Sequence, residues 1–479
     1  MSIYIYNSLT RKKEEFIPLS PGQVKIYVCG PTVYDEPHIG HARSAYIFNV
    51  IRQYLIYKGY MVKFVRNVTD VDDKIIDKAK SEYGNEDLNS ACKKIADRYL
   101  LSYHKALDDL GIPFTKPDVI EPKASEYIGK MIEFIGGLIK RGFAYETGGD
   151  VYFDIKKAAN YGKLSHQSLD KMEIGARVTP EENKKNPLDF VLWKSSKPDE
   201  PWWESPWGRG RPGWHIECSV MSSDILGDEF DIHGGGIDLI FPHHENEIAQ
   251  SEAAGKRFAR YWIHHGLLTI NGQKMAKSLG NFVTVKDVLS RYPACALKIF
   301  YLQAHYSSPI DFSWDRLNEI YKATQGFDIF FRKTEQLRKY YMTAVGKTAD
   351  FIERYKKRFF EAMDDDFNTP SAIASLFELL NYTNRFIDTE KGSTDYAKIV
   401  NEAEDTIRRL GKEVLGIDFP QLFTKLSKEE EELINKRRQA RNRKDFKTSD
   451  QLREELRKRG IIVEDTKEGQ VWRRVLPRE

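Results

Sequence analysis

The chain has 479 residues, of which 41% are apolar, enough for a sizeable core and for about three domains. Its formal net charge is only +3, so composition alone does not indicate a nucleic-acid-binding protein. No run of roughly 18 apolar residues occurs, which excludes a membrane-spanning helix, and the N-terminal stretch lacks the apolar segment of a secretory signal. The four cysteines are too scattered for a disulfide framework, so we expect a reduced, cytoplasmic protein.

The first expected strand and helix flank a pair of histidines. Val24–Val28 is a short apolar run typical of a buried strand, and a helix can begin at Pro37. His38 and His41 then share one face of the first turn, where free backbone N–H groups attract anions. Two imidazoles there could hydrogen-bond a phosphate, and Gly40 would leave room for a ligand. An isolated pair of this spacing is more often an ordinary surface feature, so a second motif is needed.

Residues 24 to about 120 alternate between strand and helix. Tyr46–Tyr57 has helical spacing, and Met61–Val68 is the next strand-like run. This alternation predicts a parallel, doubly wound sheet. The carboxylates of Asp70, Asp72 and Asp73 are expected mainly to cap the following helix. Neither G-x-G-x-x-G nor G-x-x-x-x-G-K-[ST] occurs, so a nucleotide on this sheet would not use those loops.

The pattern changes between residues 121 and 206, where we expect an insertion between two halves of the sheet domain. Ala124–Arg141 is helical in spacing, and Asp150–Ile155 and Phe190–Trp193 are short strand-like runs. Residues 211–270 then return to alternating strand and helix.

In that second half, Arg211–Trp214 is expected to open a helix that carries Cys218. Phe230–His233 is expected to be a strand, and the three glycines after it would let a ligand approach the backbone.

The C-terminal part is expected to be mostly helical. Asn271-Gly272 predicts a tight turn, and Thr284 to Asp287 resembles a capping box. Residues 319–415 are mostly helical in pattern, with one helix starting at Thr369-Pro370. The buried face of that helix is expected to comprise Ile373, Leu376, Phe377 and Leu380.

The last stretch, 433–479, is strongly basic. It holds 15 Lys and Arg against 8 Asp and Glu, a net charge of +7, and so leaves −4 for the rest of the chain. Positive charge gathered at one end suits contact with a phosphate backbone. A solvated helix would account for the charge equally well.

Four scattered residues have the right chemistry for a metal. His243 and Glu247 are four apart and meet on one helix face, while Cys29 and Cys218 each lie near an expected strand end or glycine turn. Two thiolates, an imidazole and a carboxylate can form a tetrahedral zinc site. Two buried cysteines and an unrelated helix face remain the alternative. A zinc hydrolase is disfavoured, because H-E-x-x-H is absent.

The second motif exists far downstream. His38-Ile-Gly-His41 resembles the nucleotide-binding signature of class I aminoacyl-tRNA synthetases, and residues 274–278, KMAKS, resemble their lysine loop. Over essentially the whole chain the motifs resemble those of the cysteinyl-tRNA synthetase family. They are CGPTVYDEPHIGHAR, NVTDVDDK, GARV, FVLWK, SPWGRGRPGWHIECS, FDIHGGGIDLIFPHHENEIAQS, KMAKSLGNF, DDDFNTP and GIIVEDTKEGQVWR.

This resemblance implies one Zn²⁺ ion per chain, held by Cys29, Cys218, His243 and Glu247. Ala276 departs from the family, which usually has serine there, but both lysines of the loop remain. Other implied site residues are His38, Gly40, His41, Lys274 and Lys277 for the ATP phosphates and catalysis, Gly236 and Asp238 for adenosine, and Gly30, Thr32 and Trp214 for cysteine.

The resemblance also implies a fold and a function. The fold is α/β: a Rossmann-like doubly wound catalytic domain with an insertion, then an α-helical bundle and a small C-terminal α+β domain. The expected units are 1–120 and 208–270 for the two catalytic halves, 121–207 for the insertion, 271–318 for the lysine-loop region, 319–415 for the bundle and 425–479 for a basic anticodon-binding domain. The implied activity is ligation of L-cysteine to tRNA(Cys) with ATP and Mg²⁺, by a cytoplasmic monomer without a membrane partner.

Zinc would also explain how serine is rejected. A hydrophobic pocket discriminates sulfur from oxygen by only about 10- to 200-fold, whereas Zn²⁺ prefers a thiolate to an alcohol. A separate editing site is then unnecessary. The alternatives are a cysteine ligase acting on a small amino-sugar in the mycothiol pathway, a non-catalytic RNA-binding paralogue, and a structural zinc protein.

Overall fold

The computed structural model spans the chain and describes most of it. The motif at 175–178 and the pair Lys277-Ser278 lie outside the described residues. The described residues are 2–84, 87–167, 184–197, 200–276, 279–338, 349–389, 396–419, 427–466 and 469–474.

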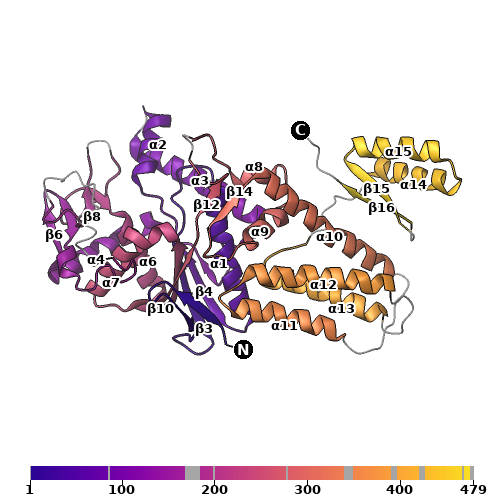
Figure 1. Cartoon of the computed structure of the whole chain (residues 1–479). Coiled ribbons are helices and arrows are strands. Elements are labelled where there is room, and N and C mark those ends of the chain that lie inside the picture. Colours follow the sequence, from indigo (N-terminus) through magenta and orange to yellow (C-terminus); the bar gives the residue numbers. More distant parts are fainter. Residues whose placement is uncertain are drawn as a thin grey trace.

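The central sheet has five parallel strands in the order β11-β10-β3-β4-β5 (Figure 1). The chain runs outward from β3 to β5 and then returns to the other side of β3 through β10 and β11. This reversal defines a doubly wound sheet, which confirms the predicted fold class. The strands are β3 (Gln23–Val28), β4 (Met61–Arg66), β5 (Val119–Ile120), β10 (Glu229–Gly236) and β11 (Phe258–His265).

Alternating side chains of β3 face two separate hydrophobic cores. Val24, Ile26 and Val28 belong to the larger core, and Tyr27 belongs to the other. Because successive residues of a strand point to opposite faces, the two cores lie on opposite sides of the sheet. The larger core includes α1 (Ile39–Tyr57), α2 (Asp73–Tyr83) and α3 (Leu88–Asp109), and the other includes α4 (Ile128–Lys140), α6 (Trp214–Leu226) and α7 (Glu245–Ala253).

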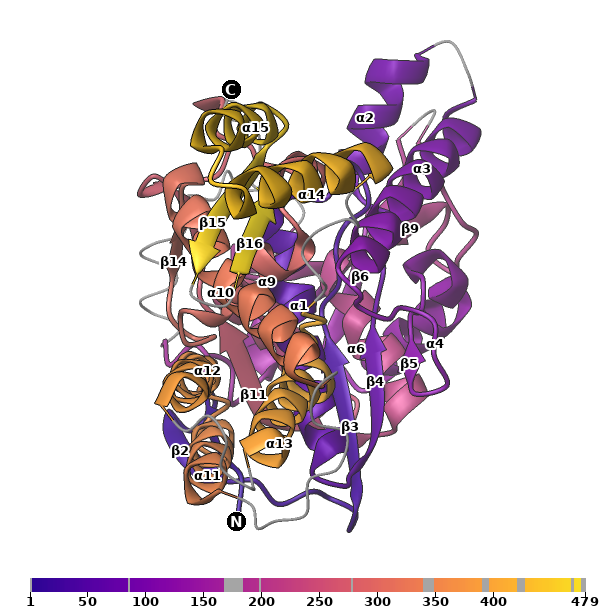
Figure 2. The ribbon, with the colours of Figure 1, turned by 90° about the vertical axis from the view of Figure 1, so that its right-hand side faces the viewer.

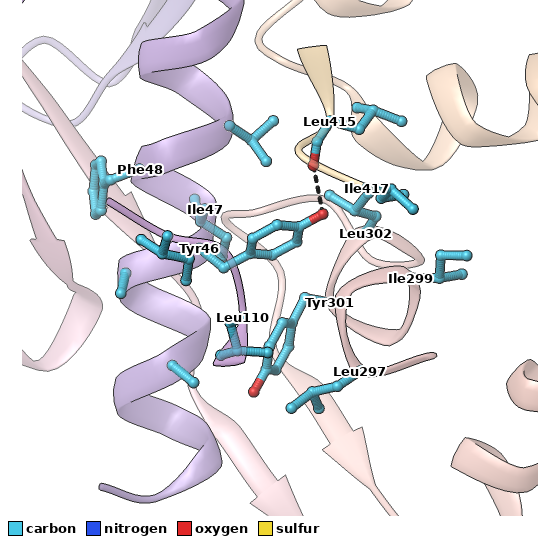
Figure 3. Close-up of a cluster of buried hydrophobic side chains, with 14 of the residues drawn as sticks. Tyr46, Ile47, Phe48, Leu110, Leu297, Ile299, Tyr301, Leu302, Leu415 and Ile417 are labelled. Atoms are coloured by element: carbon cyan, nitrogen blue, oxygen red, sulfur yellow. Dashed lines mark hydrogen bonds between the residues drawn. The ribbon is translucent and has the colours of Figure 1, made fainter. Parts of the chain in front are cut away.

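The larger core fixes α1 against the helical part of the chain. The Tyr46 hydroxyl donates to the Leu415 carbonyl at 2.6 Å, as Figure 3 shows. Tyr301, on α9 (Ala294–Leu302), donates to the carbonyl of Ile39 at 2.7 Å. The donor and acceptor residues of both hydrogen bonds are buried, so the start of α1 has a defined position.

The insertion contains α4 and most of a four-stranded antiparallel sheet, whose last strand lies past the predicted boundary at residue 207. The prediction that Arg211–Trp214 opens a helix is wrong at its start: Arg211 and Pro212 pair with β8, and α6 begins at Trp214 after Gly213. The Gly213 N–H donates to Leu192 at 2.8 Å, which extends the sheet. The strands are β6 (Ala144–Thr147), β7 (Asp150–Phe153), β8 (Phe190–Ser195) and β9 (Gly210–Pro212).

A small sheet follows the main one. Its strands are β12 (Leu268–Ile270), β13 (Gln273–Lys274) and β14 (Ile310–Phe312), in the order β13-β12-β14. The predicted Asn271-Gly272 turn joins β12 to β13, and both residues have positive φ. The predicted capping box of Thr284 and Asp287 is confirmed at α8 (Val285–Leu289).

The helical part comprises α10 (Trp314–Arg338), α11 (Asp350–Asp364), α12 (Thr369–Thr389) and α13 (Tyr396–Arg409). Ile373, Leu376 and Leu380 are buried as predicted, and Phe377 is half-buried. The cap of α12 is Asn368 rather than Thr369, because the Asn368 side chain accepts from Ser371 N–H at 3.1 Å.

The N-terminal strand lies against the end of α11. β1 (Tyr4–Asn7) pairs with β2 (Lys12–Glu15). The Tyr6 N–H donates to the Asp366 carboxylate at 2.8 Å, and the Asp366 N–H donates to the Tyr4 carbonyl at 2.9 Å. Residues at the two ends of a long stretch of chain are therefore bound together.

The C-terminal unit is a small α+β structure with its own core, as predicted. Leu456, Ile461 and Val463 form this core. Figures 1 and 2 show the unit beside α10, away from the main sheet. Its elements are α14 (Lys428–Asn442), α15 (Phe446–Lys458), β15 (Ile461–Thr466) and β16 (Gly469–Arg474). Among the described helices, none has the length and apolar character needed to cross a membrane.

Candidate active site

Helix α1 begins just past the carboxyl end of β3, and the histidine pair lies at its start. His38 is the N-cap: its Nδ1 accepts from the N–H groups of Gly40 at 3.1 Å and His41 at 3.2 Å. The predictions that the helix begins at Pro37 and leaves its first N–H groups free are therefore wrong. The two imidazole rings stack with centroids 3.6 Å apart. Because capping uses only Nδ1 of His38, its Nε2 can still serve a ligand.

The two imidazoles are neutral near pH 7. Burial lowers the pKa of His38 to about 4, and burial together with His38 lowers the pKa of His41 well below its usual value. A neutral imidazole whose Nδ1 accepts carries its proton on Nε2, so His38 can donate a hydrogen bond to an anionic oxygen. A Cβ on Gly40 would lie 2.9 Å from the His38 ring. Glycine is thus required here by the cap itself.

The segments around the lysine motif lie over the same helix start. Ile39 N–H donates to the Val283 carbonyl at 3.1 Å, and Val285 N–H donates to the Pro37 carbonyl at 3.0 Å. Lys274 ends β13 and is exposed. The structure therefore brings Lys274 into the same region as the histidine pair. Lys277 lies outside the described residues.

The side chain of Asn281 binds the backbone at the start of the lysine motif. Asn281 accepts from Ala276 N–H at 2.8 Å and donates to the Lys274 carbonyl at 3.1 Å. Both contacts are to main-chain atoms of the loop. The alanine at position 276 therefore takes part through its backbone.

The four candidate metal ligands converge although 218 residues separate the first from the last. The Sγ atoms of Cys29 and Cys218 are 3.7 Å apart, and Cys218 Sγ is 3.6 Å from His243 Nε2. Glu247 Oε1 lies 3.7 Å from Cys29 Sγ and 3.1 Å from His243 Nε2. All four donor atoms lie within 4.8 Å of one another.

These separations fit a tetrahedral ion. Zinc bonds of about 2.3 Å to sulfur and 2.0–2.1 Å to nitrogen or oxygen place neighbouring ligand atoms about 3.3–3.8 Å apart. Burial raises the pKa of Cys29 and of Glu247 well above their usual values and lowers the pKa of His243. Burying two thiols and a carboxyl group together is costly without a cation, and a divalent ion would offset that cost.

Further histidines surround this cluster. His215 Nδ1 lies 2.9 Å from His243 Nδ1, and His233 Nε2 lies 2.7 Å from Glu247 Oε2. His244 Nε2 is 3.2 Å from Cys29 Sγ. Cys29, His233, His244 and Glu247 also form a possible ligand set. The first set is favoured, because His233 bonds the other carboxylate oxygen and so suits an outer partner that orients a ligand.

Of the three proposed cysteine-binding residues, Gly30 follows Cys29 in the chain and Trp214 contacts His243. The Gly30 N–H donates to Asn67 Oδ1 at 2.9 Å, and Thr32 bridges to Thr69 on the loop after β4. The indole of Trp214 stacks on the His243 ring with centroids 4.1 Å apart, yet Trp214 is 41% exposed. A partly exposed aromatic side chain beside the two sulfur ligands can accept a small substrate.

Gly236 and Asp238, proposed for adenosine, lie at the carboxyl end of β10. Gly236 pairs with His265 of β11, and Asp238 is exposed. The expectation that all three glycines admit a ligand needs correction. A Cβ on Gly234 would lie 2.2 Å from the Phe48 ring, and one on Gly235 would lie 2.8 Å from His244. These two glycines make room for protein side chains.

The sequence analysis missed several side chains at the site. They are Asn67, which holds Gly30, and the outer histidines His215, His233 and His244. All three histidines adjoin predicted features, since His244 follows a proposed ligand, His215 follows Trp214 and His233 precedes the glycines. Only the folded chain shows which ligand each one contacts.

Comparison with known proteins identifies the class of the fold. Residues 15–322 match the family model of the class I (C) tRNA synthetase catalytic domain. Methionyl-tRNA synthetase of Mycobacterium tuberculosis, in complex with methionyl-adenylate, has a similar structure, with a TM-score of 0.62 and 14% identity over 84% of this chain and 93% of that one. A putative arginyl-tRNA synthetase of Campylobacter jejuni gives a TM-score of 0.56 and 16% identity over 85% and 95%. The catalytic part thus has the class I synthetase fold.

The particular family follows from the rest of the chain and from its curated relatives. Residues 358–420 match the DALR domain, and residues 424–473 match the cysteinyl-tRNA ligase anticodon-binding domain. Cysteine–tRNA ligase of Persephonella marina is 47% identical over 99% of this chain and 100% of its own length. That of Thermodesulfovibrio yellowstonii is 48% identical over 98% and 99%. The chain belongs to the cysteine–tRNA ligase family of class I synthetases and is an enzyme.

Proposed function

We propose that the enzyme joins L-cysteine to tRNA(Cys) in two steps. The carboxylate of cysteine attacks the α-phosphate of ATP, supplied with Mg²⁺, and gives cysteinyl-adenylate and pyrophosphate. The terminal ribose hydroxyl of the tRNA then takes the cysteinyl group and releases AMP. One observation carries this proposal: a two-thiol cluster suited to a thiol-binding metal forms at the carboxyl end of β3, and the next helix along the chain begins with the histidine pair.

The phosphate-binding side chains act by electrostatic stabilisation and by positioning. His38 and His41 would donate hydrogen bonds to phosphate oxygens as negative charge develops on them. Lys274 would support the leaving pyrophosphate, and Lys277 is assigned the same task on its sequence motif alone. Gly236 and Asp238 would lie beside adenosine at the carboxyl end of β10, where open α/β sheets bind their ligands.

Cys29, Cys218, His243 and Glu247 would hold one Zn²⁺ ion. A zinc ion at this place supplies a preference for a thiolate over an alcohol, because sulfur is the softer ligand and loses its proton on binding. Gly30 and Thr32 would line the rest of the cysteine pocket, and the exposed face of Trp214 would cover it. His215 and His233 orient two of the ligands through the contacts already described.

The zinc assignment is tested with Cys218→Ser. We expect this variant to lose bound zinc, since a serine hydroxyl is a poor ligand, while the buried site keeps nearly the same volume. Metal content is measured by atomic emission after dialysis. Cys295→Ser is the matched control, because that cysteine is also buried but lies in the larger core. Full zinc content in Cys218→Ser would remove this residue from the ligand set.

The reaction is tested by transfer of labelled cysteine to unfractionated tRNA, with labelled serine in parallel. Counts in acid-precipitable RNA with cysteine alone are the expected result. Equal counts with serine would contradict selection by a thiol-binding metal. Cysteine-dependent pyrophosphate exchange without transfer to tRNA would favour a ligase that acts on a small amino-sugar.

The described anticodon-binding unit favours tRNA as the acceptor, because a small acceptor needs no such unit. A catalytically inactive RNA-binding paralogue is disfavoured, because the histidine pair and Lys274 are all present. We expect a monomer that acts in the cytoplasm, where tRNA is charged for protein synthesis.

A further inference from the structure

Arg43 is a buried arginine on α1, two residues beyond His41. Its side chain is fully buried. Nη1 donates to the carbonyl oxygens of Gly266 at 2.6 Å and Leu267 at 2.9 Å. Nη2 donates to the carbonyl oxygens of Tyr306 at 3.2 Å and Ser308 at 2.6 Å. One guanidinium group thus joins two segments of backbone to the helix of the histidine pair.

These two segments are the roots of the sheet that carries the lysine motif. Gly266 and Leu267 lead into β12, and Ser308 leads into β14, which pairs with β12 in parallel from Leu268 and Ile310 onward. β13, which ends at Lys274, pairs with β12 in turn. The segments approach closely, since a Cβ on Gly266 would lie 2.4 Å from the Ser308 carbonyl carbon. Arg43 therefore holds the point from which the β12–β13 hairpin extends.

The far side of the lysine motif is bound to the same helix. The contacts of Val283 and Val285 with Ile39 and Pro37 fix the segment that follows the motif. The Met275 methyl group lies 3.6 Å from the position of a Cβ on Gly40. The helix of the histidine pair is thus bound to the chain both before and after the lysine motif. Arg43 makes the connection before the motif, at the root of the hairpin.

Stability alone is a poor reason for an arginine at this position. Burial lowers the pKa of Arg43 to about 10, which reflects the cost of enclosing a cation among neutral groups. An apolar side chain of similar size often costs less in such a place. A planar guanidinium can satisfy four acceptors in fixed directions, which lysine cannot do. The arrangement therefore favours a geometric role.

We propose that Arg43 is a positioning residue for adenylate formation: it sets the distance between the histidine pair and the hairpin that bears Lys274, so that both reach the same ATP phosphates. The inference rests on the proposed use of ATP by His38, His41 and Lys274. It assigns to Arg43 no contact with the substrates.

The test compares Arg43→Lys and Arg43→Met with the same changes at Arg52. Arg52 is a matched control, because it is also a buried arginine on α1 but pairs with Asp118. Cysteine-dependent pyrophosphate exchange is measured on protein that is folded by circular dichroism. We expect the Arg43 variants to lose about 100-fold in kcat and to raise KM for ATP, with KM for cysteine and zinc content unchanged, since a displacement of about 1 Å has that cost. The Arg52 variants are expected to change only the melting temperature.

A double-variant cycle separates positioning from folding. If Arg43 acts through the hairpin, Arg43→Lys added to Lys274→Ala reduces kcat little further, because the hairpin no longer carries the lysine it positions. If the kcat losses of the two single variants simply multiply in the double variant, the inference is overturned. Normal pyrophosphate exchange together with a lower melting temperature in the Arg43 variants would also overturn it. If neither Arg43 variant folds, Gly266→Ala is used instead, because it disturbs the contact between Gly266 and Ser308 that Arg43 holds. Normal kinetic constants in that variant would overturn the inference equally. Absence of exchange in the unaltered enzyme would instead refute the proposed function.

Discussion

At position 30 the backbone leaves no space for a side chain. A Cβ there would lie 1.6 Å from the carbonyl oxygen of Asn67, on the neighbouring strand end. The N–H of the same glycine donates to the Asn67 side chain. This close approach places Cys29, the preceding residue, at a fixed distance from the loop after β4.

Gly30→Ala is therefore expected to be strongly destabilising. The added methyl group must push two backbone segments apart, at a cost of about 3 kcal/mol. Urea denaturation followed by circular dichroism measures the free energy of unfolding. Gly136→Ala in α4 is the control: its Cβ meets nothing within 4 Å, and alanine favours a helix by about 1 kcal/mol. Equal stability of the two variants would contradict this account of Gly30.

His265 makes stability depend on pH. Burial lowers the pKa of His265 to about 4, against 6.5 for an exposed imidazole. The unfolded chain therefore takes up a proton near pH 6.5 that the folded chain refuses until about pH 4. The contribution of His265 to stability is complete above pH 6.5 and is lost as the pH falls between these values.

His265→Gln isolates this contribution from those of other groups. Glutamine can still donate to the Gly266 carbonyl, as His265 Nδ1 does at 3.0 Å. Between pH 7 and pH 5, the unaltered protein should lose about 2 kcal/mol more unfolding free energy than the variant. Denaturation curves at both pH values give this difference, and parallel losses in the two proteins would refute the assignment.

At the scale of the elements, Arg332 connects α10 to β16. The Arg332 guanidinium lies 3.9 Å from the centroid of the Trp472 ring, and its Nη1 donates to the Trp472 carbonyl at 3.1 Å. Asp328 orients Arg332 through an ion pair at 2.9 Å. Trp472 also packs against the small C-terminal core. Packing, rather than stacking on an anticodon base, is therefore the role that this geometry favours for Trp472.

Arg332→Ala should loosen the C-terminal unit without harming the catalytic part. We expect KM for tRNA to rise about tenfold, because a cation–π contact and a hydrogen bond together contribute about 1–2 kcal/mol. Cysteine-dependent pyrophosphate exchange should not change. Lys333→Ala removes a charge from the same helix that pairs with exposed Asp388, and it serves as the control. A rise in KM of the same size in both variants would show that charge alone matters.

Local patterns in the sequence predicted most of these elements but not their contacts. The apolar run before Cys29, the Asn271-Gly272 turn and the capping box at Thr284 each depend on a few neighbouring residues, and each was confirmed. The start of α1 was predicted at Pro37 but lies at Ile39, because a histidine is an unusual cap and proline is a common first residue.

For the candidate site too, local spacing predicted some features, whereas contacts between distant residues depend on the fold. Spacing alone placed His243 and Glu247 on one face. The approach of Cys29 and Cys218 was only suggested by their places near expected strand ends, because the fold is what brings them together. The pairing of His215 with His243 and of Asn67 with Gly30 depends on side-chain directions across two elements. No periodic pattern along the chain encodes such contacts.

At the scale of the whole molecule, positive charge is concentrated far from the catalytic sheet. The stretch from 433 onward carries +7, and the rest of the chain carries −4. Figure 1 shows the C-terminal unit well apart from the main sheet. Binding of tRNA through this unit should therefore depend on salt, while chemistry at the sheet should not.

Raising potassium chloride from 50 to 200 mM is expected to raise KM for tRNA about tenfold or more, because released counterions oppose binding at higher salt. The rate of cysteine-dependent pyrophosphate exchange should change less than about twofold, since close contacts in a buried site are weakly screened. Steady-state kinetics of both reactions across the salt series make the comparison. Equal salt dependence would mean that the basic end has no special part in tRNA binding.

The binding of Tyr4 and Tyr6 to Asp366 has a consequence for the synthesis of the chain. One edge of β1 pairs with β2 nearby in the chain, but Asp366, which binds the other edge, is synthesised 360 residues after Tyr6. At 5–20 residues per second, that delay is about 20 to 70 s. During this time that edge of β1 lacks its later partner, so a nascent-chain chaperone or a fused N-terminal tag would meet it before Asp366 does.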